Sequence, residues 1–157
     1  MKQLTWKLIL PLTVISCTVF TKWWYVLPVD APDSMMLGFP IPYVCDGWHT
    51  SMSLQIFFFE LLIDLFTYFS LWFVVIFCID KFMVKIKLHK IIIILLLTTG
   101  GLFTCGLTYI ALMPENIFYA KRNFDIDVLV TGYKFMWDGN TRPKNFDFAE
   151  YHKRKNQ

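Results

Sequence analysis

Three long runs of apolar residues divide this chain, and each approaches the length of a membrane-spanning helix. They extend over about residues 8–27, 54–79 and 91–113. A helix needs roughly 20 apolar residues to cross about 30 Å of hydrocarbon. Pro28 and Pro114 follow the first and third runs, at positions where helices are expected to end. The pattern therefore predicts three transmembrane helices.

The residues after the third run follow a different pattern. Residues 114–122 combine apolar side chains with two basic residues, which predicts a short interfacial helix lying against lipid. Two short stretches, 127–130 and 133–137, are rich in β-branched and aromatic residues. They flank Thr131-Gly132, so they predict a β-hairpin.

Composition indicates a membrane protein. The 157 residues are 56% hydrophobic and 18% aromatic, which is too apolar for a water-soluble domain of this size. The net charge of +3 is modest, and the basic residues are grouped in a way that suits anionic lipid head groups rather than nucleic acid. We expect an all-α membrane protein with a transmembrane domain over 1–113, an ordered outer loop over 29–52 within it, and a small extracytoplasmic C-terminal segment over 114–157.

The lysines predict the orientation in the membrane. The connection between the second and third runs is rich in lysine and two lysines precede the first run, whereas residues 29–52 contain no Lys or Arg. By the positive-inside rule, the N-terminus and the lysine-rich connection are cytoplasmic, and the outer loop and the C-terminus lie outside. The lysines concerned are Lys2, Lys7, Lys81, Lys85, Lys87 and Lys90.

Two acidic residues interrupt the second run. Glu60 and Asp64 are four residues apart, so they share one face of a helix, and Thr67 extends this polar stripe. A charge near the bilayer centre costs on the order of 3 kcal/mol and normally faces protein or a water-filled cavity. Three interpretations follow: the carboxyls hydrogen-bond to the third helix, they line a path for cations or protons, or they pair with basic residues of another subunit. Lys22 is the internal cation placed to reach Glu60.

The third run carries small and hydroxylated residues in its outer half. Such residues let helices approach closely, and glycine or cysteine four positions apart forms a typical small-residue packing pair. We expect this side of the third helix to pack against another helix. The residues concerned are Gly100, Gly101, Thr104, Cys105 and Gly106.

The loop between the first two runs is rich in proline, glycine and aromatic residues. Two prolines separated by one residue favour an extended stretch, and aromatic rings favour the head-group level of a membrane. We expect an ordered loop packed on the outer membrane face. Its interface residues are Gly38, Phe39, Pro40, Pro42 and Trp48.

Three residues of the same loop have side chains that can bind a metal ion. They are Cys45, Asp46 and His49. One Cys, one Asp and one His within a single turn, without a second group of ligands, is more typical of a packing loop than of a metal site. We therefore treat them as weak metal candidates and expect no cofactor.

One short pattern resembles a known group of proteins. The run Gly-Phe-Pro-Ile-Pro-Tyr at 38–43 precedes a helix that contains Leu-Leu-Ile-Asp-Leu-Phe at 61–66. This resembles small uncharacterised bacterial inner-membrane proteins that have a Gly-Phe-Pro motif ahead of an acidic transmembrane helix, and the resemblance covers residues 38–69. It implies a bacterial cytoplasmic-membrane setting and implies that Asp64 and the proline loop belong to one structural unit. It implies no particular activity.

These observations favour a non-catalytic function. Three helices and a small outer segment are too little for most autonomous transporters, which rely on repeats or oligomers. We expect an accessory or structural subunit of a larger bacterial inner-membrane complex, with lipids and other integral membrane subunits as partners. It would dock through the polar face of the second helix and the small-residue face of the third. The alternative is a small homo-oligomeric cation or proton translocator that uses Glu60 and Asp64, and a membrane enzyme or metal site in the outer loop is the third hypothesis.

Overall fold

A computed structural model describes residues 4–29, 32–48, 53–83, 85–86 and 89–139 of the chain. The described part is a mixed α/β structure rather than an all-α one. Its helical elements are the π-helical turn η1 (Thr5–Ile9), helix α2 (Leu10–Val19), helix α3 (Phe58–Cys78), the π-helical turn η2 (Ile79–Met83) and helix α4 (Lys90–Ala111). Its strands are β1 (Phe20–Pro28), β2 (Ser34–Leu37), β3 (Val44–Asp46), β4 (Leu54–Phe57), β5 (Ile117–Tyr119) and β6 (Ile126–Phe135).

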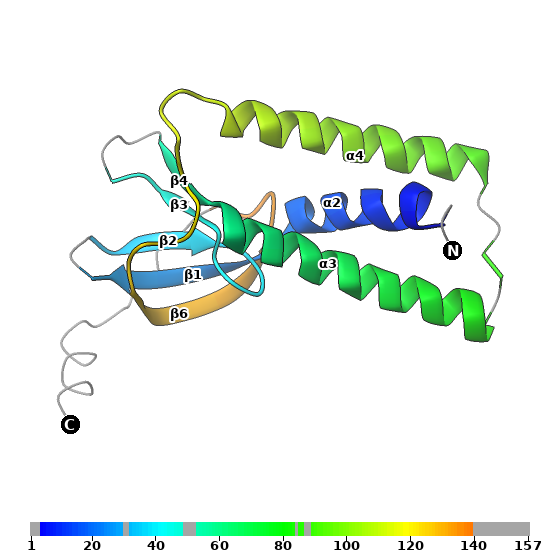
Figure 1. Ribbon diagram of the computed structural model, residues 1–157, viewed down its shortest axis with the longest axis horizontal. Coiled ribbons are helices and arrows are strands. Elements are labelled where there is room, and N and C mark those ends of the chain that lie inside the picture. The colour runs from blue at the N-terminus through cyan, green and yellow to red at the C-terminus, as the bar shows by residue number, and fades with distance from the viewer. Residues whose placement is uncertain (1–3, 30–31, 49–52, 84, 87–88, 140–157) are drawn as a thin grey trace.

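The helices form one end of the molecule and the strands form the other. Helix α2 lies between α3 and α4 and packs against both (Figure 1). The turn η1, the end of α3 and the start of α4 lie together at the end far from the sheet (Figure 1). Leu4, Ile9 and Ile76 form a buried cluster there, with Phe69 and Trp72 of α3 packed against it. The helical end therefore has a small apolar core of its own, centred on α2.

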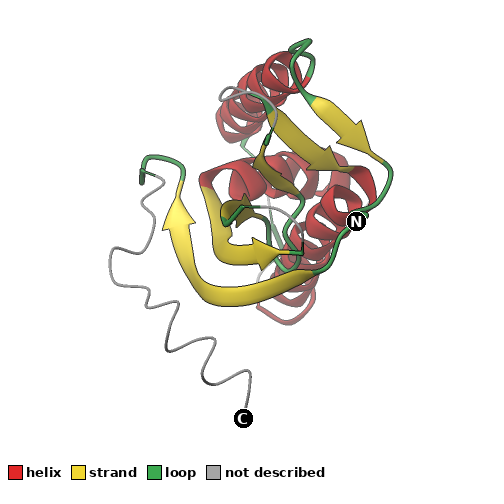
Figure 2. Ribbon diagram, turned by 90° about the vertical axis from the view of Figure 1, so that its left-hand side faces the viewer, coloured by secondary structure: helices red, strands yellow, loops and turns green. Residues whose placement is uncertain are grey.

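The six strands that the structure describes form a single sheet in the order β5-β4-β3-β2-β1-β6. Neighbouring strands are antiparallel except for β4 and β5, which run parallel and are connected through α3 and α4. Figure 2 shows that the sheet is curved rather than flat. Val26, Met36, Cys45 and Phe57, one from each of the first four strands, form its buried core. Tyr119 of β5 and Ile126 of β6 pack on the same core, so all six strands surround it.

The first apolar run is not a spanning helix, and the expectation of an all-α protein with three such helices is wrong. The helical part of this run, Thr5–Val19, has 15 residues. At 1.5 Å per residue it is about 22 Å long, which is shorter than a hydrocarbon core of about 30 Å. The chain then continues directly as β1, where consecutive aromatic and β-branched residues such as Trp24, Tyr25 and Val26 suit a strand. Because β1 lies between β2 and β6, pairing on both sides stabilises the extended conformation.

The second and third apolar runs do form helices. Helix α3 begins at Phe58 rather than at Leu54, because residues 54–57 pair with β3 and β5 as strand β4. Two helical segments are long and apolar enough to cross a membrane, Phe58–Met83 with 26 residues and Lys90–Ala111 with 22 residues. Both leave large apolar side chains exposed along much of their length.

The C-terminal segment also differs from the sequence prediction. Residues 117–119 of the expected interfacial helix form β5, and the expected hairpin is one continuous strand, β6. Gly132, placed in the turn by sequence analysis, lies in β6 opposite Trp23. A Cβ atom there would come within 2.7 Å of the Trp23 indole, so glycine makes room for the ring across the strand pair.

Candidate functional site at the junction of helices and sheet

Asp64 lies at the centre of the junction between the helices and the sheet. Its side chain is fully buried, at 0% exposure, although it belongs to the otherwise apolar helix α3. The thiol of Cys17 on α2 donates a hydrogen bond to Asp64 Oδ2 at 3.3 Å, and the backbone N–H of Phe39 donates to Oδ1. Asp64 therefore joins three elements of the chain: α2, α3 and the loop between β2 and β3.

Tyr68, one turn further along α3, extends this junction. Its hydroxyl donates to the backbone oxygen of Phe20 at 2.6 Å, at the point where α2 gives way to β1. Its ring meets the edge of Phe39, with 5.9 Å between the ring centroids. Thr67 does not take part, because its hydroxyl donates to the backbone oxygen of Ile63 within α3. The polar face of α3 that carries Glu60 and Asp64 was expected to include Thr67, but it includes Tyr68 instead.

Glu60 connects α3 to the segment between β5 and β6, separately from the contacts of Asp64. Its side chain is 6% exposed, and Oε1 accepts a hydrogen bond from the backbone N–H of Arg122 at 3.2 Å. The neighbouring backbone bond, from Phe59 N–H to Ala120 O at 3.0 Å, holds the same segment. Glu60 Oε2 and Arg122 Nη1 are both buried without a hydrogen-bond partner in the part of the chain that the structure describes. Glu60 thus fixes the β5–β6 connection against the first turn of α3.

Other groups that sequence analysis placed near the carboxyls lie elsewhere. Lys22 is in β1, and its ammonium lies over the Trp24 ring at 3.7 Å rather than beside Glu60. The third helix does not supply the hydroxyls for Asp64, since α2 separates α3 from α4 (Figure 1). Cys17 and Arg122 had no sequence signal that pointed to them, whereas the resemblance implied that the proline loop, which contains Phe39, lies with Asp64. Cys17, Phe39 and Arg122 are 47, 25 and 62 residues away from the carboxyl that each one contacts.

The proline loop is an internal part of this junction. Gly38 is buried, and its backbone is held by bonds from Gly38 N–H to Lys22 O at 2.9 Å and from Trp24 Nε1 to Gly38 O at 2.8 Å. Pro42 is also buried, while Phe39 and Pro40 are half-buried. Trp48 lies farther away and packs against Phe124, with 5.0 Å between the ring centroids. The structure therefore brings Asp64 and the proline loop together through Phe39.

The three metal candidates do not form a group among the described residues. Cys45 is 2% exposed in the core of the sheet, whereas Asp46, the next residue of β3, is exposed on the other face. His49 lies outside the described residues. Burial raises the pKa of the Cys45 thiol to about 12, and the nearby Asp46 carboxylate acts in the same direction. The thiolate form that a metal requires is therefore disfavoured at neutral pH.

The small residues of α4 lie on different sides of the helix. A Cβ atom on Gly100 would meet Pro11 of α2 at 3.3 Å, so this glycine lies in the contact between the two helices. In the part of the chain that the structure describes, no atom outside α4 lies within 4 Å of such a Cβ position on Gly101 or Gly106. Cys105 is exposed, and the Thr104 hydroxyl donates to the backbone oxygen of Gly100 at 2.8 Å. Of the five residues, Gly100 packs against α2, and no described residue covers Gly101 or Gly106 on α4.

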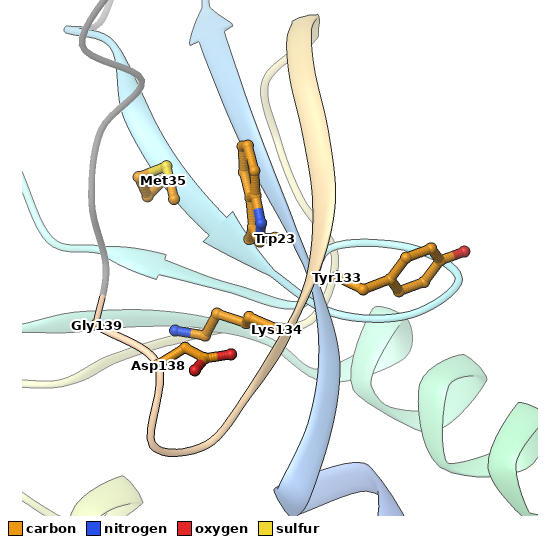
Figure 3. A pocket seen from close by; sticks show the side chains of 6 residues that line it. All are labelled: Trp23, Met35, Tyr133, Lys134, Asp138 and Gly139. Carbon is orange, nitrogen blue, oxygen red and sulfur yellow. The ribbon is translucent and has the colours of Figure 1, made fainter.

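A small pocket lies on the sheet, away from both carboxyls. It encloses about 170 Å³, below the range of roughly 300–1,000 Å³ that is typical of sites for drug-sized ligands. Lys134 extends toward Asp138 on one side of β6, whereas Tyr133 points to the other side (Figure 3). Partial burial lowers the pKa of Lys134, and the Asp138 carboxylate opposes this shift. The residues that line the pocket are Trp23, Met35, Tyr133, Lys134, Asp138 and Gly139.

Two substitutions of Glu60 distinguish the effect of its hydrogen bond on stability from the effect of its charge. We expect Glu60→Gln to keep the bond from Arg122 N–H and to lower the free energy of unfolding by less than about 1 kcal/mol. Glu60→Leu leaves that N–H without its acceptor, so we expect a loss of about 2 kcal/mol. Thermal unfolding of the full chain in one detergent, followed by near-ultraviolet circular dichroism, measures both. Equal losses in the two variants would show that the charge of Glu60, and not its hydrogen bond, holds the β5–β6 connection.

No protein-family model, curated protein or solved structure matches this chain.

Proposed function

We propose that this chain is a non-catalytic membrane subunit in which α3 and α4 cross the bilayer and the sheet lies on one side of it. The observation that carries this proposal is the contrast between the two kinds of side chain on these helices. The carboxyls of Glu60 and Asp64 are engaged inside the chain, while large apolar residues along α3 and α4 are exposed. Continuous apolar helix surfaces of this length are costly in water and favourable in lipid.

The positions of the lysines support one orientation. Lys7 of η1, Lys81 of η2 and Lys90 of α4 lie at the end of the molecule far from the sheet (Figure 1). Basic residues next to spanning helices favour the cytoplasmic side. We propose that this end is cytoplasmic and that the sheet is extracytoplasmic, in a bacterial inner membrane as the sequence resemblance implies.

Labelling with a membrane-impermeant maleimide tests this orientation. We expect Gly139→Cys to react in intact cells and Lys81→Cys to react only after the membrane is permeabilised. The native cysteines give a low background, because Cys17 and Cys45 are buried and Cys78 and Cys105 lie on the proposed spans. The reverse labelling pattern would contradict the orientation, and labelling of both positions in intact cells would contradict the membrane crossing.

The assignment as a subunit rests on the free side of α4. Among the described residues this helix packs mainly on α2 and η1, and its remaining surface carries large apolar side chains together with small residues and threonines. Gly101 and Cys105 are four residues apart, so they share one face, and their small side chains allow a second helix to approach closely. We propose that a helix of another integral membrane protein packs on this face. The enclosure of both carboxyls favours this role over an ion path along α3. Of the two docking faces that the sequence suggested, it leaves the small-residue face of α4 as the proposed one.

Two matched substitutions test the docking face. Gly101→Leu and Gly106→Leu introduce the same side chain into open space on α4. They lie about 140° apart around a helix with roughly 3.6 residues per turn. We expect the tagged protein, purified in a mild detergent from its native membrane, to carry a larger membrane protein in fixed ratio. Gly101→Leu should reduce this recovery by about ten-fold, as expected when an overpacked contact loses roughly 1.4 kcal/mol, whereas Gly106→Leu should keep it.

Mass spectrometry of the purified material reads out the result. A wild-type protein that purifies alone in the mild detergent would contradict the subunit proposal. Equal recovery of the partner with both variants would place the contact on another face of the protein. Both variants should be at least as stable as the wild type, because leucine favours a helix interior more than glycine does and a Cβ atom at either position meets nothing within 4 Å in the described part of the chain.

A further inference from the structure

A row of exposed aromatic side chains follows β6 to its end. Tyr133 and Phe135 alternate along β6, so they lie on one side of the strand, and Trp137 in the turn that follows stacks on Phe135. We call these three residues the aromatic ridge. Phe135 and Trp137 stack with 5.0 Å between their centroids and 4° between their planes. Trp137 is 70% exposed, and the other two rings are also exposed. Large apolar rings in such a row need a partner that excludes water from them.

The ridge lies where the helices meet the sheet. The backbone N–H of Met136 donates to the oxygen of Val19, the last residue of α2, at 2.8 Å. Phe20, the next residue, stacks on Tyr133 at 5.4 Å and contacts Phe135 at 5.5 Å between centroids. The ridge is therefore level with the sheet-side end of the helical bundle.

Exposed aromatic residues occur near both ends of the apolar helices. Phe59 of α3 and Tyr109 of α4 are exposed near the sheet, and Phe82 and Trp6 are exposed near the opposite end. Phe59 and Phe82 are 23 residues apart along one helical segment. This separation is about 35 Å, which matches a hydrocarbon core of about 30 Å with an aromatic layer at each boundary. Because Val19 and the ridge belong to the sheet-side end, they fall within the layer nearest the sheet.

We propose that the aromatic ridge is seated in the head-group region of the same bilayer that α3 and α4 cross, so that the sheet rests on the membrane along β6. Aromatic rings favour this region because their apolar bodies meet the acyl boundary while their edges and polar groups remain hydrated. The partner is thus the lipid surface itself. The inference rests on the proposed membrane crossing and adds to it that the sheet is held against the membrane.

Quenching of tryptophan fluorescence by brominated lipids tests the seating of the ridge. The full chain is reconstituted in phosphatidylcholine vesicles whose bromines lie either close to the head groups or close to the chain ends. The contribution of Trp137 is the difference between the wild type and Trp137→Phe. We expect shallow bromines to remove about half of this contribution, deep bromines to remove little, and aqueous iodide to have almost no effect, because interfacial rings lie near the glycerol level.

Two other tryptophans provide matched references. Trp72 of α3, whose Nε1 donates to Ser16 Oγ at 2.9 Å, reports on the proposed span through Trp72→Phe. Trp48 packs on Phe124 and its indole nitrogen is buried, so it reports on a ring that protein covers and serves as the control through Trp48→Phe. Deep bromines should quench Trp72, and neither lipid should quench Trp48.

The outcomes separate this inference from the membrane proposal. A protein that does not float with the vesicles overturns both proposals. If Trp72 is quenched by deep bromines but Trp137 is quenched by iodide alone, the membrane crossing stands and the seating of the ridge is wrong. If Trp137 is shielded from bromine and iodide alike, protein rather than lipid covers the ridge, and the inference is again wrong.

Discussion

Replacement of Asp64 by alanine is expected to lower the free energy of unfolding by about 3 kcal/mol, because the Phe39 N–H loses its acceptor and three elements lose their common contact. For a chain of this size, that loss lowers the melting temperature by about 10 °C. Thermal unfolding of the purified protein in a single detergent measures the change. Since Asp64 is fully buried, loss of its packing adds to loss of its hydrogen bonds.

Asp64→Asn is the matched control for this prediction. Its amide oxygen can still accept from Phe39 N–H, and its amide group keeps the volume of the carboxyl. We expect this variant to lose about 1 kcal/mol, mainly through a weaker contact with the Cys17 thiol. If asparagine destabilises the protein as much as alanine does, the negative charge of Asp64 carries the stabilisation. If alanine has no effect, Asp64 does not hold the junction together.

Gly38→Ala is the second substitution for which we expect a large effect. Gly38 has a φ angle of 147°, a backbone conformation that L side chains rarely adopt. A Cβ atom there would also overlap the backbone oxygen of Ile41 and come within 2.8 Å of Tyr43. Backbone strain and overpacking each cost on the order of 2 kcal/mol, so we expect a loss of about 4 kcal/mol in the free energy of unfolding. The same thermal unfolding measurement applies.

Gly101→Ala separates this effect from the general effect of replacing a glycine. Gly101 lies within α4, and among the described residues no atom of another element comes within 4 Å of its Cβ position. Alanine in a helix interior is more favourable than glycine, so this variant should gain about 0.5 kcal/mol. A Gly38→Ala protein as stable as the wild type would show that the loop adopts another conformation.

A double-mutant cycle connects the two predictions. Gly38 precedes Phe39, whose N–H donates to Asp64, so distortion at Gly38 should also disturb the contact with Asp64. We expect the double variant to lose about 1 kcal/mol less stability than the sum of the losses from Gly38→Ala and Asp64→Ala. Full additivity would mean that the loop and the carboxyl stabilise the protein independently.

Local sequence patterns predicted which residues of the candidate site are unusual but not which residues they contact. Glu60 and Asp64 are conspicuous because charges are rare in an apolar helix. Their spacing placed them on one face but did not identify their partners. Asp64 meets Cys17 and Phe39, and Glu60 meets the backbone of Arg122, across separations of 25 to 62 residues. Such pairings arise from the packing of whole elements and leave no periodic signal.

The sequence by itself determined the two long apolar helices, since a run of more than twenty apolar residues is compatible with little else than α3 and α4. Only the tertiary structure decided the conformation of residues 20–28, which are apolar enough for a helix and aromatic and β-branched enough for a strand. Strand β1 is selected because β2 and β6 pair with its two edges, and β6 lies about a hundred residues away. The same holds for Gly132, which is a turn residue by pattern and a strand residue because Trp23 covers it. An apolar run thus indicates that a segment avoids water, whereas its backbone conformation depends on whether its hydrogen bonds are satisfied within a helix or by a distant strand.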